Sequence, residues 1–574
     1  MRIISFFVSF ILIYGSFSCS KRKGNVITVL AGQSINTAIQ KCDMGDTILI
    51  HGGTYREVIH LNKSGICLKA FPNEKVLITG TEEVRNWKEI RPSVYSAYCE
   101  KEVLQLFNGT RMLLPARWPN FDSSMYSTAN WKKIYTSKDS ARFIDSNWPK
   151  NYWNGALCFA IAGKKWVVNV EQVRSTNDSI LKMKDKWFNY LGKWYTGEGE
   201  GYILKHINAL DTLNEWHWQN DSLFVVCNGN PQVLNAQTSE ILLLSENTSD
   251  ISIENITFLG GKIKLVNTEN ILLEKLIVKN GTAPKVYEYS NGYSYASIEI
   301  TGESENCVIQ NSLIDGNWGG GIYFEGEGNK VTNCVVSNCN WMGNGTANIA
   351  TNGEDHTISF CDVFNSGKFL ILHNNTQHLT IKNNHLYNGG YLANDLGLTY
   401  CYVTDGNESE IAYNVVHGNY AKEAGVGIYI DMEGKKFLIH HNVVYDCKYG
   451  IQTVMSAYDH ELYNNTIMGC AKAINYWGVD GSNMYNQRVY NNISEDLFDA
   501  GTDIQFNLST HDKMFIDAEN HDYRLKKGAK AIDFGTYIPE ITNEFAGEKP
   551  DAGAFEYGMP AWEFGCNKSL LNKF

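Results

Sequence analysis

Short apolar strands, each followed by a turn rich in Gly and Asn, recur along much of this chain. From Ile251 to about Leu497 the unit spans roughly 22 to 30 residues, the length of one coil of a three-sided parallel β-solenoid. Asn tolerates the left-handed backbone of such turns, and its amide can bond from coil to coil. The turns are marked by Asn311, Asn333, Cys361, Asn384, Asn414, Asn442, Asn465 and Asn492. The pattern predicts an all-β, right-handed parallel β-helix.

Residues 25–83 have the pattern expected for the start of such a helix. Ser34 can cap a short amphipathic helix in which Ile35, Ala38 and Ile39 share one side. The short strands VIHLN, ICLKA and VLITG follow. A helix in this place would cover the apolar end of the first coil, so we expect 25–83 to form an N-terminal cap and the first coils.

The repeat is absent from residues 84–245, which are dense in Trp and Tyr and contain alternating stretches such as KWVVNVEQV. We interpret this part as a β-rich domain inserted after the first coils and packed beside the helix. Two independent domains joined end to end are the alternative. The coil pattern resumes afterwards, which favours the insertion. We then expect the main β-helix over 246–510 and a closing segment over 511–574.

Residues 1–19 have the features of an export signal. Arg2 precedes an apolar run from Ile3 to Tyr14, which is too short to span a bilayer, and small residues lead to Cys19. Cys19 resembles the lipidated Cys of a bacterial lipoprotein, and ordinary signal cleavage nearby is the alternative. We expect an exported protein, in the periplasm or on the outer membrane, including its outer face, with the lipid as its membrane contact.

Charge and cysteine usage narrow the classes of partner. The net charge of -12 argues against nucleic acid, because phosphate binding needs a basic surface. The cysteines are scattered through apolar runs without CxxC spacing, so neither a disulfide framework nor a zinc site is predicted, and no calcium-loop signature is present. We expect a monomer without metal or cofactor, whose partner is a polysaccharide or oligosaccharide.

Carboxylates gather on one expected strip of the helix. The strand GIYFE, ending at Glu325, matches GIYID, ending at Asp431. The same alignment adds His373 and Asp405, and Asp395 enters just before the strand that leads to Asp405. Because neighbouring parallel strands lie about 4.8 Å apart, the acids would come together on one open face.

Paired carboxylates at such separations are the groups that hydrolyse glycosidic bonds: one donates a proton to the leaving oxygen, and the other attacks carbon or activates water. We therefore predict Asp395, Asp405 and Asp431 as catalytic candidates. His373 and Glu325 are predicted to contact substrate. The aromatic residues expected to stack on sugar rings beside the acids are Trp318, Trp341, Tyr391, Tyr400 and Tyr429. Solvated acids on a structural face are the alternative.

Several stretches resemble glycoside hydrolase family 141. They are LKAFPNEKVLITGTEEVRNW, LQLFNGTRMLLPARWPN and the series DLG, TDG, EIAYNVVH, GIYID and HHNVVYDC. The resemblance covers most of the chain from about Asn25 to Gly558. It implies a β-helix enzyme of a group with which α-L-fucosidase and xylanase activities are associated. It also implies that two Asp residues do the chemistry, at positions that match Asp395 and Asp431 here.

Two other functions remain open. A polysaccharide lyase on the same fold must neutralise a uronate and abstract its α-proton, typically with Lys or Arg. Here Lys368, Lys422 and Lys448 lie near the strip but out of register, which argues against a lyase. A non-catalytic glycan-binding solenoid is the second alternative. It predicts that changes at Asp395 or Asp431 leave the biological activity untouched.

Overall fold

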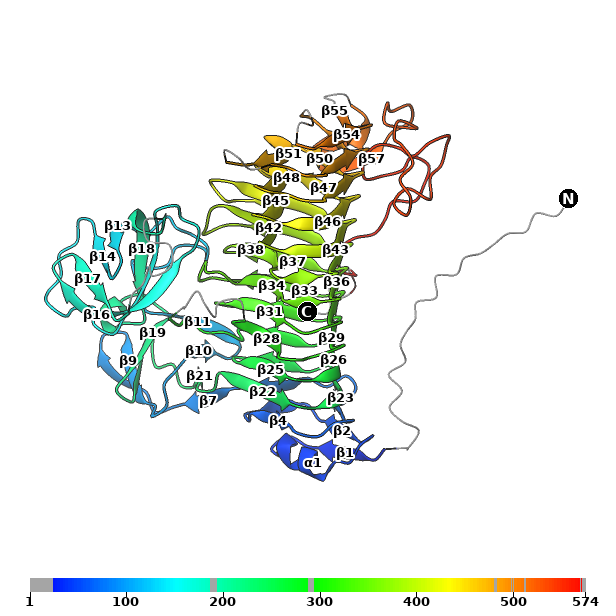
Figure 1. Cartoon of the computed structure of the whole chain (residues 1–574). Helices are drawn as coiled ribbons and strands as arrows, with labels where there is room; N and C mark the ends of the chain where they lie inside the picture. Colours follow the sequence, from blue (N-terminus) through cyan, green and yellow to red (C-terminus); the bar gives the residue numbers. More distant parts are fainter. Residues whose placement is uncertain are drawn as a thin grey trace.

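The computed structural model has the shape of a long solenoid with a second body beside it (Figure 1). The residues it describes are 24–185, 194–286, 294–479, 483–496, 498, 500–509, 513–567 and 569. The predicted export signal and Cys19 lie outside these residues. Within the described ranges no helix is long and apolar enough to cross a membrane. The solenoid is a right-handed parallel β-helix, which confirms the fold predicted from the repeat.

Each coil contributes strands to three long parallel sheets. Among the described residues, the sheet from β1 (Val26–Val29) to β54 (Asp503–Gln505) has 14 strands, and the sheet from β3 (Gly53–Tyr55) to β55 (Leu508–Ser509) has 13. The third, called the site sheet below, has 11 in that part of the chain. Its strands in spatial order are β4 (Ile59–Leu61), β22 (Ile241–Glu246), β25 (Lys262–Val266), β28 (Ala296–Thr301), β31 (Gly320–Phe324), β34 (Ala347–Thr351), β38 (Phe369–Leu372), β42 (Leu396–Tyr402), β45 (Gly425–Asp431), β48 (Tyr449–Val454) and β51 (Lys472–Trp477).

The predicted cap helix is α1 (Ile35–Lys41), at the blue end of the solenoid in Figure 1. The Ser34 side chain accepts a hydrogen bond from the Thr37 backbone N–H at 3.2 Å, which satisfies a donor that the first turn of a helix leaves open. Ile35 and Ile39 are buried with the first strands. The helix therefore covers the apolar end of the core, as its pattern predicts.

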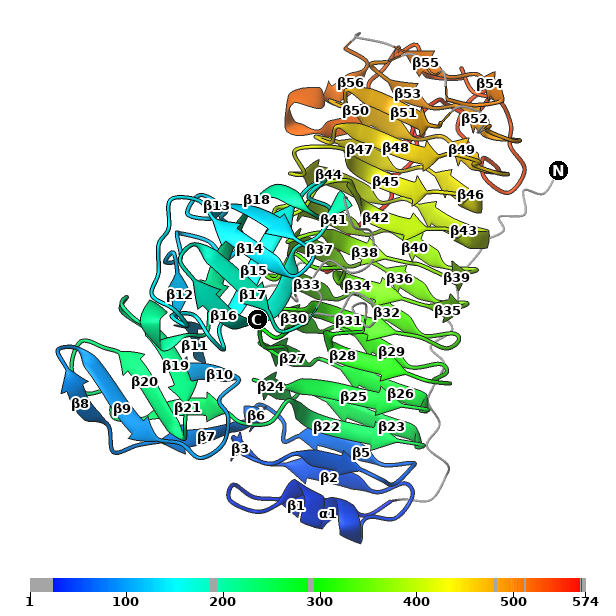
Figure 2. The ribbon, with the colours of Figure 1, turned by 60° about the vertical axis from the view of Figure 1, so that its left-hand side comes forward.

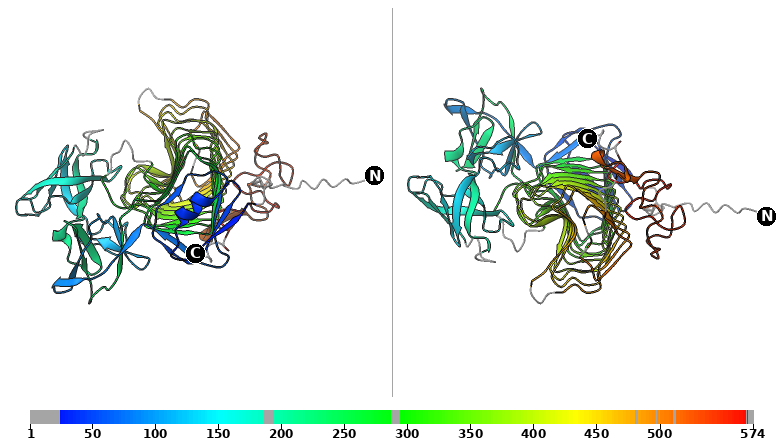
Figure 3. Two further views of the ribbon diagram at one scale, coloured as in Figure 1. Left: turned by 90° about the horizontal axis from the view of Figure 1, so that it is seen from below. Right: turned by 90° about the horizontal axis from the view of Figure 1, so that it is seen from above.

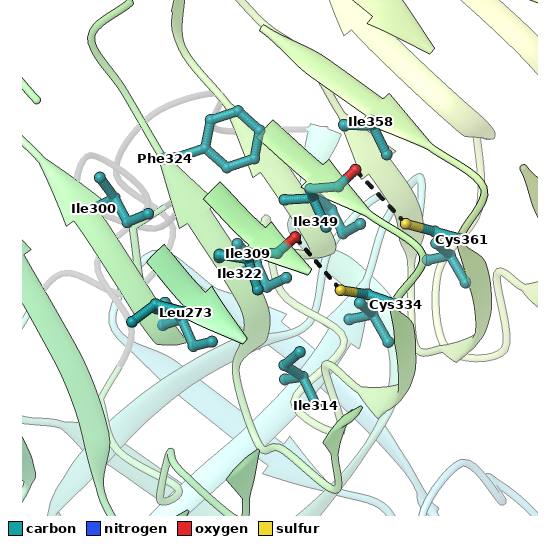
Figure 4. Packing of buried hydrophobic residues seen from close by; sticks show 14 of the residues in the cluster. Leu273, Ile300, Ile309, Ile314, Ile322, Phe324, Cys334, Ile349, Ile358 and Cys361 are labelled. Atoms are coloured by element: carbon teal, nitrogen blue, oxygen red, sulfur yellow. Dashed lines mark hydrogen bonds between the residues drawn. The ribbon is translucent and has the colours of Figure 1, made fainter. Parts of the chain in front are cut away.

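The core is a set of side-chain columns that run along the helix axis. In the site sheet, Ile322, Ile349 and Ile371 are stacked in register and are fully buried. Thiols share the same interior: Cys334 donates to the Ile309 carbonyl at 3.6 Å (Figure 4). None of the described cysteines forms a disulfide. The solenoid is thus held by apolar burial and backbone pairing.

A ladder of buried asparagines links successive coils. The Asn414 side chain donates to Asn442 Oδ1 at 3.0 Å and to the Ile381 carbonyl at 2.9 Å. The same pattern is formed by Asn384, Asn414, Asn442, Asn465 and Asn492. The predicted landmarks Asn311 and Asn333 lie elsewhere: both are part-exposed turn residues with φ near +50°.

The coil stack is continuous across the inserted domain. β6 (Val76–Thr79) pairs directly with β24 (Thr257–Leu259). The strands between them, from β7 (Thr81–Val84) to β21 (Leu234–Gln237), form an eight-stranded and a seven-stranded sheet, counted over the described residues. These sheets lie beside the solenoid (Figures 1 and 2), between strands whose coils pair directly with each other.

Backbone bonds fix the insert against the middle coils. Val168 N–H donates to the Gly343 carbonyl at 2.9 Å, and Asn394 N–H donates to the Lys165 carbonyl at 2.8 Å. Through the bond to Asn394, the insert is attached to the turn immediately before Asp395. The C-terminal segment packs on the other side of the solenoid (Figure 3).

Candidate active site

Asp395 and Asp431 belong to neighbouring coils of the site sheet. Asp395 directly precedes β42, and Asp431 is the last residue of β45, which pairs with β42. The register aligns Tyr400 with Tyr429, and Tyr402 with Asp431. Both carboxyl side chains are half-buried. The two acids predicted by the family resemblance are thus brought to one region of the molecule.

Two tyrosines cross between the coils and bind one acid each. Tyr400 Oη donates to Asp431 Oδ2 at 2.7 Å, and Tyr429 Oη donates to Asp395 Oδ1 at 3.2 Å. Their rings meet edge to face, 5.3 Å apart. Because Asp431 also accepts from the Met432 backbone N–H at 2.9 Å, its carboxyl group has a fixed orientation. The four side chains form one network, called the acid–tyrosine network below.

The two carboxyl groups have shifted ionisation. Burial raises the pKa of Asp431 to about 6, and the negative charge of Asp395 raises it as well, while the bond from Tyr400 opposes the shift. Burial also raises the pKa of Asp395, but Tyr429 and Lys368 oppose that shift. A buried acid that keeps its proton in mildly acidic solution beside a second carboxyl group is the arrangement needed for acid–base chemistry.

Lys368 is a third charged group of this site, although the sequence alignment placed it out of register. It directly precedes β38, the neighbour of β42, and is only 7% exposed. Its Nζ lies 4.3 Å from the centroid of the Phe369 ring, which in turn stacks on Tyr400 at 4.5 Å. Burial lowers the pKa of Lys368 to about 8, against the charges of Asp395 and Asp431. A lysine before a buried apolar strand, GKFLIL, was the signal in the sequence.

Asp405 does not lie with the other two acids, so its predicted position was wrong. It begins β43 (Asp405–Ala412), which belongs to the 14-stranded sheet rather than the site sheet. Its carboxylate pairs with Lys435 at 3.2 Å. The chain turns the corner at Val403, which has a φ of 47°, so the residues after Tyr402 have already left the site sheet.

His373 was also misplaced, by one position. Leu372 pairs with Tyr400, so the next residue, His373, belongs to the row of side chains that points into the core. His373 is fully buried, and neither of its ring nitrogens has a hydrogen-bond partner. A glycan in the groove could not touch it. Glu325 lies in the predicted row but four strands from Asp431, a distance on the order of 19 Å. There it accepts from Tyr323 Oη at 2.8 Å.

The predicted aromatic residues separate into two groups. Tyr400 and Tyr429 belong to the acid–tyrosine network. Trp318 is 1% exposed and packs edge-on against Trp341 beneath the insert. The ring of Tyr391 is stacked between those of Tyr126 and Tyr420. Trp341 and Tyr391 line a separate cavity of about 650 Å³ between insert and helix.

No group of three or more described His, Cys, Asp or Glu side chains is arranged to hold a metal ion. The charges around the acid–tyrosine network come from protein side chains on several elements. Besides Lys368, they are Glu423, which raises the pKa of Asp395, and Lys164 of the insert, which lowers it.

Comparisons with known proteins agree with the architecture. Residues 242–493 match the family described as "Right handed beta helix region". A solved structure titled "Glycoside hydrolase" aligns with a TM-score of 0.59 at 11% identity, over 81% of this chain and 97% of that one. The structure of XylC with xylose aligns with a TM-score of 0.43 at 14% identity, over 83% of this chain and 76% of that one. The structure of the pectate lyase Pel9A aligns with a TM-score of 0.37 at 12% identity, over 94% of this chain and 98% of that one. No curated protein sequence matches this chain.

Proposed function

We propose that this protein is a glycoside hydrolase that acts on a polysaccharide or oligosaccharide, with Asp431 and Asp395 as its catalytic pair. The observation that supports this proposal is the acid–tyrosine network: two half-buried carboxyl groups on neighbouring coils, each held by a tyrosine of the other coil. The signal-like N-terminus supports an enzyme that meets its glycan outside the cytoplasm. The solved structure titled "Glycoside hydrolase" has a similar fold, so this fold is compatible with the proposed activity.

In this mechanism the two acids have different roles. Asp431, whose pKa is raised to about 6, holds a proton and donates it to the oxygen of the leaving sugar. Asp395 acts as a carboxylate on the sugar carbon or on a water molecule, so that the bond to the leaving oxygen breaks as the new bond forms. Tyr400 and Tyr429 hold the two carboxyl groups in place through their hydroxyl groups.

One observation favours a lyase as the second candidate. Lys368 has a pKa lowered to about 8, and a lysine with such a pKa can act as a general base. A uronate would, however, bring a further negative charge next to Asp395, Asp431 and Glu423. This charge balance favours a neutral sugar and hence the hydrolase.

The test uses protein without residues 1–19 and a panel of fucosylated, xylan and pectic glycans. Reducing-sugar release and the absorbance of an unsaturated uronate are recorded together. We expect sugar release without the absorbance, and a loss of about 10²- to 10⁴-fold in kcat/KM for Asp395→Asn and Asp431→Asn.

Asp405→Asn is the matched control, because this acid lies on another sheet and should leave sugar release unchanged. Appearance of the absorbance would identify a lyase instead. Full activity in both Asp395→Asn and Asp431→Asn would exclude the pair.

A further inference from the structure

Lys368 is a charged residue of the candidate active site that takes no direct part in the proposed hydrolysis. It stands at the start of β38, as Asp395 stands at the start of β42, and these strands are hydrogen-bonded neighbours. The two residues therefore share one corner of the solenoid, on consecutive coils. Asp431 lies at the opposite end of its strand, β45, one coil further on. The backbone of Lys368 is thus closer to that of Asp395 than to that of Asp431.

The Lys368 ammonium group has little solvent and, in the described part of the chain, no hydrogen-bond acceptor. The residue is 7% exposed, and its Nζ lies over the Phe369 ring at 4.3 Å. A buried ammonium group without a partner is unfavourable unless nearby negative charge compensates for it. The compensating charges are Asp395, whose effect is the larger, and Asp431.

We propose that Lys368 is the positioning residue that keeps Asp395 in its carboxylate form while Asp431 retains the proton. This inference rests on the proposed function. It gives a reason why one acid is ionised and the other protonated, although burial raises the pKa of both. An opposite charge close to a carboxyl group favours its ionised form. Burial has the largest effect on Asp395 and raises its pKa; Tyr429, Lys368 and Lys164 oppose that rise, and Glu423 adds to it. Burial is the largest effect at Asp431 too, and there the charge of Asp395 adds to the rise in pKa, whereas the hydrogen bonds of Tyr400, Met432 and Tyr429 oppose it.

The first test is the pH profile of kcat/KM in the Lys368→Met variant. Methionine keeps most of the aliphatic chain against Phe369 and removes the charge. Without that charge the pKa of Asp395 rises, so the acid limb should move to higher pH by about 1 unit, and by more than the alkaline limb. In Lys368→Ala, n-propylammonium should return the acid limb toward lower pH, whereas n-propanol should not.

A second measurement does not depend on activity. Carbodiimide modifies carboxyl groups in their protonated form, so the labelling of Asp395 against pH, followed by peptide mass spectrometry, reports its ionisation. Asp405 serves as the internal reference. We expect the midpoint for Asp395 to be higher in Lys368→Met than in the wild type, in protein whose thermal unfolding shows that it is folded.

These measurements separate the two ideas. If no glycan is cleaved but the labelling midpoint rises, the hydrolase proposal fails and the role of Lys368 stands. If glycans are cleaved but neither the midpoint nor the acid limb moves in folded Lys368→Met, Lys368 does not control Asp395. A uniform loss of activity at every pH with an unchanged midpoint has the same meaning.

Discussion

At the residue scale, the two tyrosine hydroxyl groups oppose the effect of burial on the ionisation of the acids. The hydroxyl of Tyr400 donates to Asp431 and so stabilises its charged form, whereas burial stabilises the neutral form. The pKa of about 6 is the balance of these opposing effects. A tyrosine that only packed against substrate would leave this balance unchanged.

Tyr400→Phe should therefore move one limb of the pH profile. Loss of the hydroxyl raises the pKa of Asp431, so the general acid keeps its proton to higher pH and the alkaline limb of kcat/KM moves up. Tyr429→Phe should move the acid limb in the same direction, because its bond to Asp395 is lost. Profiles measured from pH 3 to 9 test this, with Tyr458→Phe, which stacks on Tyr485 away from the acids, as the control.

His373 should make folding sensitive to acid. Burial lowers its pKa to about 3, whereas the unfolded chain takes up the proton near the usual value of 6.5. The stability from this group is thus complete above about 6.5 and falls as the pH decreases toward 3. His373→Leu should flatten the dependence of Tm on pH in this range. His460, with a pKa of about 4, keeps part of the slope, and an unchanged slope would contradict the assignment.

At the element scale, the asparagine ladder adds buried side-chain hydrogen bonds to the backbone pairing between successive coils. The Asn442 side chain donates to the Ile411 carbonyl at 2.8 Å and to Asn465 Oδ1 at 3.0 Å. Its own Oδ1 accepts from the backbone and side chain of Asn414. One amide therefore satisfies groups on three consecutive coils.

Asn442→Ala should leave several of these buried groups without partners. Each costs about 1–3 kcal/mol, so we expect a loss of at least about 3 kcal/mol in the free energy of unfolding. Denaturant unfolding followed by circular dichroism measures it. Asn483→Ala, at an exposed asparagine, is the control and should change stability by less than about 0.5 kcal/mol. Equal losses in both variants would contradict a structural role for the ladder.

The sequence predicted the solenoid, the cap helix and the insertion, because each leaves a local pattern of apolar residues. It also aligned Glu325 with Asp431 correctly, since β31 and β45 share the motif GIY. It failed at His373 and Asp405 because the intervening strands differ in length: β38 has four residues, β42 has seven. In a strand, a shift of one residue moves a side chain from the groove to the core. Turn lengths are not encoded in the apolar pattern.

At the scale of the whole molecule, the insert packs tightly against the solenoid at Gly343. A Cβ atom there would lie 2.7 Å from Val168 of the insert and 2.9 Å from Leu392. Gly343 also has a φ of +65°, which favours glycine. The sequence predicted an insert packed beside the β-helix, but not which residues make the contact, because contacts between separate bodies depend on side chains far apart in the chain.

Gly343→Ala should loosen the contact between the insert and the β-helix without unfolding the β-helix. We expect faster proteolysis between residues 84 and 245 and a higher KM, because the Lys165 carbonyl is bonded next to Asp395. Gly109→Ala is the matched control: its φ is +61°, but no atom lies within 4 Å of an added Cβ. Equal proteolysis of both variants would attribute the effect to backbone strain alone.

The continuity of the coils across the insert has a consequence for the order of folding. Ser245 of β22 bonds to the Leu61 carbonyl, 184 residues earlier in the chain, whereas Leu438 pairs with Glu461 only 23 residues away. Loop-closure entropy grows by about 0.6 kcal/mol per doubling, so the first contact costs about 2 kcal/mol more to form than the second. The later coils, which hold the acids, can assemble from nearby segments, and so can the first coils, in which Val26 pairs with Thr47. The junction between the two groups of coils must wait for a distant part of the chain. The candidate active site thus belongs to a part of the solenoid that can form before this junction closes.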